Sequence, residues 1–285
     1  MKLSTASRST VSTSAVAGRR AGVRRRVGRR VVNGAAVFAL LYLFAPIAVI
    51  VLFSFNRPVG KFNLVWQHFT LRNWMHPFAR KELTQAMVLS LRIAVLAALI
   101  ATALGTLVAL ALTRYRFRGS AAVNLLLVLP LTTPEIVLGA SLASLFIQRG
   151  VKRGFATILI AHVMFCLSFV ALTVKARLRG FDWTMEDAAM DLGAGPIRTF
   201  VRITLPLIAP GILAAFLLSF AISIDDFITT LFNAGNRITY PLQIFGASRA
   251  ELPPQVHVLG TMVLLVGVVF LVGGALVGMK RAARR

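Results

Sequence analysis

Six long apolar runs, separated by short polar segments, dominate the hydrophobic pattern of this chain. They cover about residues 32–55, 84–112, 121–147, 156–176, 207–231 and 256–279. A helix needs roughly 20 mostly apolar residues to cross a bilayer, and a longer run is accommodated by tilt. Because the runs are continuous and do not alternate in polarity, they favour helices over the strands of a closed barrel. The pattern predicts an all-α integral membrane protein with six transmembrane helices.

Composition and charge agree with this class and orient the chain. The sequence is 57% hydrophobic and 14% charged, which excludes an ordinary soluble domain. The net charge is +23, but the basic residues are spread over loops and tails, so we do not expect nucleic acid as a partner. With the N-terminus in the cytoplasm, the cytoplasmic segments hold 21 Lys and Arg residues and the outer segments hold 10. This asymmetry predicts cytoplasmic N- and C-termini.

The chain divides into a membrane-embedded body and two basic tails. Residues 1–30 contain no acidic residue and are predicted to form a disordered cytoplasmic tail that touches anionic membrane lipid. An organelle transit peptide or a twin-arginine signal has similar composition, but no credible cleavage site follows. Residues 31–83 hold the first span and an external amphipathic segment, in which Trp66 and Trp74 suit the membrane interface. Residues 84–279 hold the other five spans, and residues 280–285 form a second cytoplasmic tail.

A polar, acidic segment of about 28 residues, 178–205, lies between the fourth and fifth apolar runs. Acidic residues favour the start of a helix, Gly193 suits its end, and Pro206 suits the first turn of the next helix. The small residues there allow close backbone approach. A membrane protein gains little from such a segment unless a soluble partner binds it, so the segment predicts a docking element. Its key residues are Glu186, Asp187, Ala188, Ala189, Gly193, Ile203, Leu205 and Pro206.

Catalytic and cofactor motifs are absent from the sequence. There is no G-x-x-x-x-G-K-[ST] phosphate loop, no H-E-x-x-H and no G-x-S-x-G. The four histidines stand at no metal-ligand spacing, and His162 suits a hydrogen-bonded packing role. Cys166 is the only cysteine, so no disulfide forms within the chain. We therefore expect no cofactor, no metal and no enzymatic activity; a polytopic membrane enzyme would need polar groups clustered at one depth.

Three carboxylates fall inside apolar runs. A charge at the centre of a bilayer costs roughly 2.5–3.5 kcal/mol on insertion scales, so such residues usually face a cavity and mark a pathway. Glu135 is flanked by Pro130 and Pro134, which are predicted to break the third helix, and Asp225 and Asp226 are predicted near the outer end of the fifth span. Three acidic groups favour a cationic cargo. The alternative is that the two aspartates are water-exposed helix-end residues without a role.

The polar segment resembles a known motif. It contains Glu186-Asp187-Ala188-Ala189, then Gly193, then Ile203-Thr204-Leu205-Pro206. This arrangement resembles the loop of permeases from binding-protein-dependent ABC importers, in which E-A-A-x-x-x-G is followed, after nine residues, by I-x-L-P. Asp187 stands in place of the first alanine of that motif. Residues 114–119, 134–137, 165–170, 177–182 and 223–227 resemble the second permease subunit of spermidine/putrescine importers. The resemblance covers about residues 32–279.

This resemblance implies a type I ABC importer permease fold, with the E-A-A loop as a cytoplasmic coupling loop between spans four and five. It implies separate ABC ATPase subunits, a second homologous permease subunit and an external substrate-binding protein as partners, in a bacterial plasma membrane. Glu186 is then expected to pair with a basic residue of the ATPase, and Glu135, Asp225 and Asp226 to line the cargo path. Alternatives are a permease for another small solute and a stand-alone secondary transporter, which would not need the cytoplasmic loop.

Overall fold

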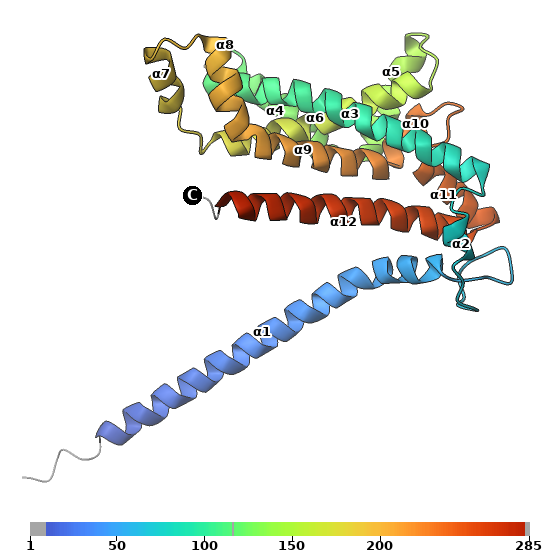
Figure 1. The fold of residues 1–285 in the computed structure, drawn as a ribbon, viewed down its shortest axis with the longest axis horizontal. Helices are drawn as coiled ribbons and strands as arrows, with labels where there is room; N and C mark the ends of the chain where they lie inside the picture. Colours follow the sequence, from blue (N-terminus) through green and yellow to red (C-terminus); the bar gives the residue numbers. More distant parts are fainter. Residues whose placement is uncertain (1–9, 116, 283–285) are drawn as a thin grey trace, which may run out of the picture. The chain divides into compact units, whose positions relative to one another are not determined.

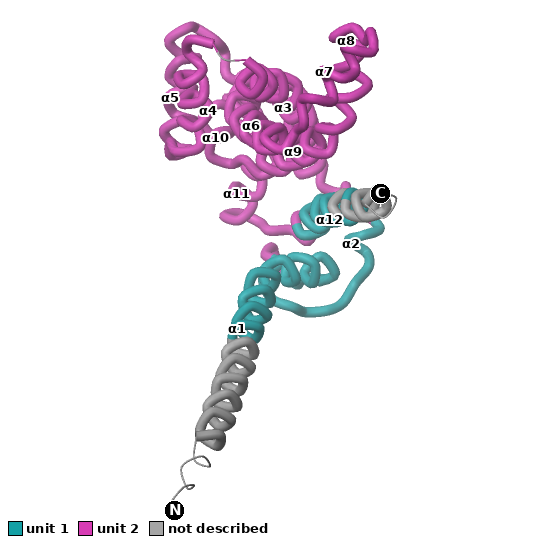
Figure 2. The backbone as a smooth tube through the Cα atoms, turned by 90° about the vertical axis from the view of Figure 1, so that its left-hand side faces the viewer, with its two compact units in different colours: residues 1–59, 63–75, 257–285 teal, residues 60–62, 76–256 magenta. Residues whose placement is uncertain are grey.

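The computed structural model describes the backbone of residues 10–115 and 117–282. Regular structure in this part of the chain is helical, and the only extended pairings there are isolated bridges between Asn56 and Phe69 and between Phe62 and Leu252. The predicted all-α class is thereby confirmed. The chain forms two compact units, which Figure 2 colours separately. Unit 1 contains residues 1–59, 63–75 and 257–285, and unit 2 contains residues 60–62 and 76–256.

Unit 1 contains α1 (Thr10–Ser54), α2 (Arg72–Met75) and most of α12 (Pro254–Ala282). Helix α1 begins at Thr10, within the predicted tail, and the disorder expected for residues 1–30 stays a prediction. The remaining parts of the two predicted tails, residues 1–9 and 283–285, lie outside the described residues.

The external segment after α1 folds back on the end of that helix. The Asn56 side-chain amide donates to Asn63 Oδ1 at 2.7 Å, and both side chains are fully buried. The Trp74 indole donates to the hydroxyl of Ser54, the last residue of α1, at 3.1 Å. Trp66 stays 40% exposed. Of the two tryptophans expected at the membrane interface, Trp74 therefore takes part in a hydrogen-bonded clasp on α1, because its indole N–H finds a protein acceptor there.

Unit 2 is a bundle built around three long helices, α3, α6 and α9, which lie side by side (Figure 1). Their contact is lined by small residues, including fully buried Ala94, Ala97, Ala101 and Ala215, so the backbones approach closely. In chain order the helices of this unit are α3 (Lys81–Arg114), α4 (Ser120–Thr132), α5 (Glu135–Gln148), α6 (Phe155–Leu178), α7 (Thr184–Asp191), α8 (Pro196–Thr199), a π-helical turn η1 (Phe200–Thr204), α9 (Leu205–Asp225), α10 (Ile228–Asn233) and α11 (Tyr240–Ala250).

Within the described residues, five helices are long and apolar enough to cross a membrane, and a bent pair makes six if it is counted as one span. The bent pair is α4 and α5, and the chain bends by 109° at the break between these two helices. The fifth span runs from Pro196 to Asp225, so it begins earlier and ends earlier than the predicted run 207–231. Six apolar segments were predicted and six are present, but the third and the fifth differ in shape or bounds.

Candidate functional site

The polar loop between α6 and the fifth span (Pro196–Asp225) contains a short helix, α7, as expected. Asp182 accepts hydrogen bonds from the backbone N–H of Thr184 at 3.1 Å and from its hydroxyl at 2.7 Å, which begins the helix. At the other end, Gly193 has a φ of +83°, and the Ala194 N–H donates to the Ala189 carbonyl at 3.0 Å. This is the left-handed glycine ending that the sequence predicted, because glycine has no Cβ to strain there.

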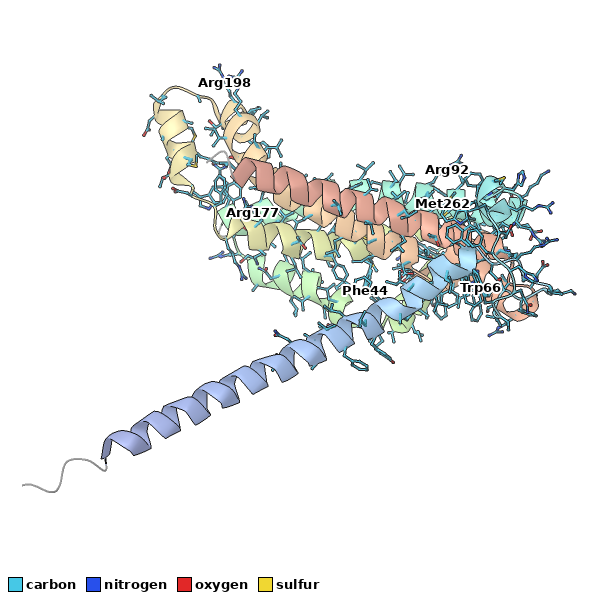
Figure 3. All side chains as sticks on the ribbon, turned by 60° about the horizontal axis from the view of Figure 1, so that its bottom comes forward. Phe44, Trp66, Arg92, Arg177, Arg198 and Met262 are labelled. Atoms are coloured by element: carbon cyan, nitrogen blue, oxygen red, sulfur yellow. The ribbon has the colours of Figure 1, made fainter. Side chains whose placement is uncertain are left out.

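The loop exposes a set of apolar side chains beside basic ones. Leu192 is 90% and Ile197 is 80% exposed. A shallow pocket of about 570 Å³ is lined by Ile197, with Arg198 and Arg202 also in its walls, and Figure 3 labels Arg198 at this loop. Exposed apolar residues rimmed by polar ones mark interaction surfaces. Ala188, which we placed in the docking motif, is also exposed on α7.

Glu186 is not the exposed rim charge that we expected. Its side chain is 3% exposed; Oε2 lies 2.8 Å from Arg114 Nη1, and Oε1 accepts a hydrogen bond from the Thr204 hydroxyl. The guanidinium of Arg114 also lies over the Trp183 ring, 5.7 Å from its centroid. Glu186 therefore joins the end of α3 to the start of the fifth span within this chain. Asp187, the next residue, is exposed and is the carboxylate that a partner can reach.

Pro206 lies in the first turn of α9, where it was predicted, but η1 leads into that helix directly and the apolar span already begins at Pro196. Proline lacks an N–H donor and its ring crowds the preceding turn. The π-helical turn η1 directly precedes it and widens the helix, so that the Leu205 N–H donates to the Phe200 carbonyl five residues earlier. Ile203 and Leu205 consequently belong to the same helical segment as Pro206, and both are partly buried.

Glu135 is the first residue of α5, directly after the break between α4 and α5. The break was predicted, but its position depends on Pro134 alone, because α4 continues through Pro130 to Thr132. Glu135 is exposed at the positive end of the α5 dipole, which favours a carboxylate there.

Asp225 and Asp226 take different positions although they are neighbours. Asp225 is the last residue of α9, is exposed, and has no side-chain partner among the described residues. Asp226 lies in the break before α10, where Oδ1 accepts hydrogen bonds from the Thr230 N–H at 2.8 Å and from its hydroxyl at 3.2 Å. Its carboxylate also lies 3.8 Å from His162 Nε2. Asp226 thus stabilises the break, and Asp225 is left free.

A buried polar cluster at this break was only partly anticipated. His162 is 3% exposed; its Nδ1 lies 2.7 Å from Ser223 Oγ and its Nε2 lies 2.9 Å from Thr230 Oγ1. The predicted role of His162 as a hydrogen-bonded packing residue is confirmed. Its partners come from α9 and α10, about 60 residues away, so no local pattern identified them.

The two helix breaks are brought together in unit 2. α5 packs against α10, and the Asn233 side-chain amide donates to the Gly139 carbonyl of α5 at 3.2 Å and to the Thr229 carbonyl at 2.9 Å. Among the described residues no hydrogen bond or ion pair joins Glu135 to either aspartate, and no group of three His, Cys, Asp or Glu residues is placed to hold a metal ion. The carboxylates thus stand on neighbouring broken helices without forming one cluster.

The sequence has close relatives among characterised permeases. The chain is 39% identical over 242 residues to the spermidine/putrescine transport system permease protein PotC of Haemophilus influenzae, which covers 84% of this chain and 93% of that protein. It is 37% identical to PotC of Escherichia coli K12, over 88% and 95% of the two chains. It is 39% identical to the putrescine transport system permease protein PotI of Escherichia coli K12, over 81% and 84%.

Solved structures match the fold at low sequence identity. A bacterial ABC transporter involved in the import of the acidic polysaccharide alginate matches with a TM-score of 0.64 at 14% identity, covering 90% of this chain and 96% of that one. An amino acid ABC transporter solved with histidines matches with a TM-score of 0.54 at 15% identity, covering 74% and 96%. The predicted importer permease fold is confirmed. Residues 101–279 match the model of one family, and on that match and the identity to the permeases above, this chain belongs to the binding-protein-dependent transport system inner membrane components.

Proposed function

We propose that this chain is the permease subunit of an ATP-driven importer and forms the translocation pathway for polyamines, spermidine or putrescine, across the bacterial plasma membrane. The observation that carries the cargo assignment is the 37–39% identity to permeases named for spermidine/putrescine and putrescine transport. The solved structures are named for alginate and amino acid cargo, so the fold by itself selects no cargo. A permease for another small solute is therefore the competing function.

The loop that carries α7 is the proposed docking site for the ATPase subunits. Three features support this: the exposed Leu192 and Ile197, the tight turn at Gly193, and the exposed Asp187 beside them. ATP hydrolysis is assigned to those separate subunits, since the sequence has no phosphate loop of its own. A second permease subunit and an external binding protein complete the proposed assembly. The loop and both termini then face the cytoplasm, in line with the basic residues there.

The free carboxylate of Asp225 is the proposed contact for the cationic cargo. It is exposed at the end of a span and has no partner within the described residues, whereas Asp226 is engaged by Thr230 and His162. A polyamine is a flexible polycation, and an unpaired carboxylate at membrane depth attracts it. Attraction at a few separated groups, with Glu135 as another, lets the cargo leave again, as flux requires.

The test compares single Asn substitutions at the two aspartates in the assembled importer. Asp225→Asn should lower uptake of labelled putrescine or spermidine more than Asp226→Asn, because in the second variant the amide oxygen of the new side chain still accepts from the Thr230 N–H. We expect roughly a tenfold loss of cargo affinity for Asp225→Asn, the equivalent of one charged interaction. Assembly with the ATPase should remain normal in both variants.

A matched control removes a carboxylate that already has a partner. Glu251 pairs with Arg80 on the surface of the same unit, so Glu251→Gln should leave uptake unchanged. If the Asp225→Asn, Asp226→Asn double variant imports polyamine at the parental rate, the acidic path is wrong. If the parental complex imports another small solute and no polyamine, the cargo assignment is wrong while the permease assignment stands.

A further inference from the structure

A polar pocket of about 710 Å³ lies where α3 begins, and none of the coupling or pathway residues takes part in it. Its walls come from the first three turns of α3 and from the segment around the start of α11, both within unit 2. The polar side chains that line it are Glu82, Thr84, Gln85, Arg92, Asn236, Arg237 and Gln243.

Two of these side chains are guanidinium groups that lack a partner. Neither Arg92 nor Arg237 makes a side-chain hydrogen bond or an ion pair within the described residues, and Glu82 lies within 4.0 Å of neither. The charged groups of the pocket therefore sum to +1. Both residues are exposed, so a ligand can reach their side chains, and the planar fork of a guanidinium matches a phosphate group.

The depth of Arg92 in the membrane follows from the sequence of α3. Residues 93–113 contain no charged side chain and span 21 residues, or about 31 Å of helix. This equals the roughly 30 Å thickness of the hydrocarbon core, with Arg92 directly before the run and Arg114 directly after it. Arg92, which the sequence pattern placed inside the second span, thus lies at the level of the lipid headgroups.

An apolar stripe continues from Arg92 along α3. Val88, Val95 and Leu99 are 39%, 40% and 53% exposed. Counted from Val88, Arg92 follows at four residues, Val95 at seven and Leu99 at eleven, which places all of them on one helix face. Figure 3 labels Arg92 at this end of α3. A cationic polar pocket at headgroup depth above an exposed apolar face matches a molecule with an anionic head and an acyl chain.

We propose that this pocket binds the phosphate headgroup of an anionic phospholipid from the leaflet at that end of α3, with an acyl chain along the exposed α3 face. Arg92 and Arg237 hold the phosphate oxygens, and the neighbouring amides of Gln85 and Asn236 donate to the headgroup. The same phosphate chemistry is offered by a free phosphate ion, but only the lipid also covers the apolar stripe.

The test titrates the purified, fully assembled transporter with phosphatidylglycerol and counts bound lipids by native mass spectrometry. The Arg92→Gln, Arg237→Gln double variant should weaken the tightest phosphatidylglycerol site by about tenfold or more, because charged hydrogen bonds are lost. The Arg92→Lys, Arg237→Lys variant keeps the charge and should retain most of the affinity. Arg149→Gln removes an exposed basic residue outside the pocket and should have no effect.

Two further results would overturn the proposal. Inorganic phosphate at millimolar concentration should not displace the lipid; displacement would assign the pocket to a free anion. Unchanged phosphatidylglycerol affinity in the double Gln variant would mean that the pocket holds no lipid, as when another subunit covers it. If the double variant does not assemble, the single Arg237→Gln variant, which changes a loop residue only, replaces it in the titration. Unchanged phosphatidylglycerol affinity in that variant would overturn the proposal in the same way.

Discussion

The buried ion pair between Glu186 and Arg114 makes the coupling loop sensitive to a change that leaves its surface intact. Replacing Glu186 by Gln keeps the side-chain shape and an acceptor for the Thr204 hydroxyl, but it removes the charge opposite Arg114. The pair connects α7 to the end of α3. We therefore expect α7 to lose order in the Glu186→Gln variant, while the spans stay folded.

The expected loss of stability depends on the burial of the Glu186 carboxylate and on the partial exposure of the Arg114 guanidinium. A hydrogen bond to a charged group contributes about 1.5–3 kcal/mol. The Arg114 side chain is 38% exposed, so water replaces part of what is lost. We expect Glu186→Gln to destabilise the ordered loop by about 1–2 kcal/mol, which is a factor of roughly 5–30 in its population. Glu186→Lys should cost more, since it brings a second cation next to Arg114.

Hydrogen exchange of peptides that cover residues 184–195, measured in the assembled complex, reports this loss of order. Asp191→Asn changes another exposed carboxylate of α7, which has no partner among the described residues, and should leave exchange unchanged. The deciding experiment is rescue: Arg114→Glu combined with Glu186→Lys should restore protection and coupled uptake within this chain. If a charge reversal on the ATPase rescues Glu186→Lys and the internal reversal does not, then Glu186 faces the partner and the reasoning from its burial is refuted.

Two glycine substitutions give further predictions. Gly105→Val should lower the Tm of the complex, because an added Cβ would lie 2.7 Å from Val170 Cγ1 and overpacking costs about 1–3 kcal/mol. Gly267→Val, with no atom within 4 Å of the added carbon, is its control, and equal Tm values would contradict the packing argument. Gly193→Trp should insert normally but uncouple ATP hydrolysis from uptake, because its φ of +83° strains any β-carbon. Gly193→Asn tolerates that backbone better and should keep more coupling, and normal uptake by Gly193→Trp would remove the turn from the docking surface.

The spans and the turn at Gly193 were predictable because their causes are local. An apolar run of about 20 residues has few alternatives to a transmembrane helix, and a glycine after a short amphipathic helix has a specific conformational use. Prolines were harder to interpret. Pro130 lies inside α4, whereas Pro206 is in the first turn of α9 and Pro134 directly precedes α5 at the break. Whether a proline breaks a helix depends on how its surroundings satisfy the freed carbonyl groups.

Partnerships between distant residues could not be read from the sequence. The motif around Glu186 indicates an acidic, exposed loop, but it does not say which carboxylate turns inward. That choice depends on Arg114, 72 residues earlier in the chain, and on Thr204. The same holds for His162, because its hydroxyl partners lie on α9 and α10, which were predicted as one apolar run, 207–231. Long-range contacts of this kind decide which polar residues are structural and which remain free.

The helix dipoles separate the three candidate pathway carboxylates. Glu135 begins α5, where the positive end of the dipole stabilises a carboxylate, so a helix start suffices to explain it. Asp226 is explained by its hydrogen bonds to Thr230. Asp225 has neither reason: it ends α9, where the dipole disfavours a negative charge by about 0.3–1 kcal/mol, and it has no partner in the described residues. A carboxylate held against the dipole and without a partner is the one of the three that a cationic cargo would complete.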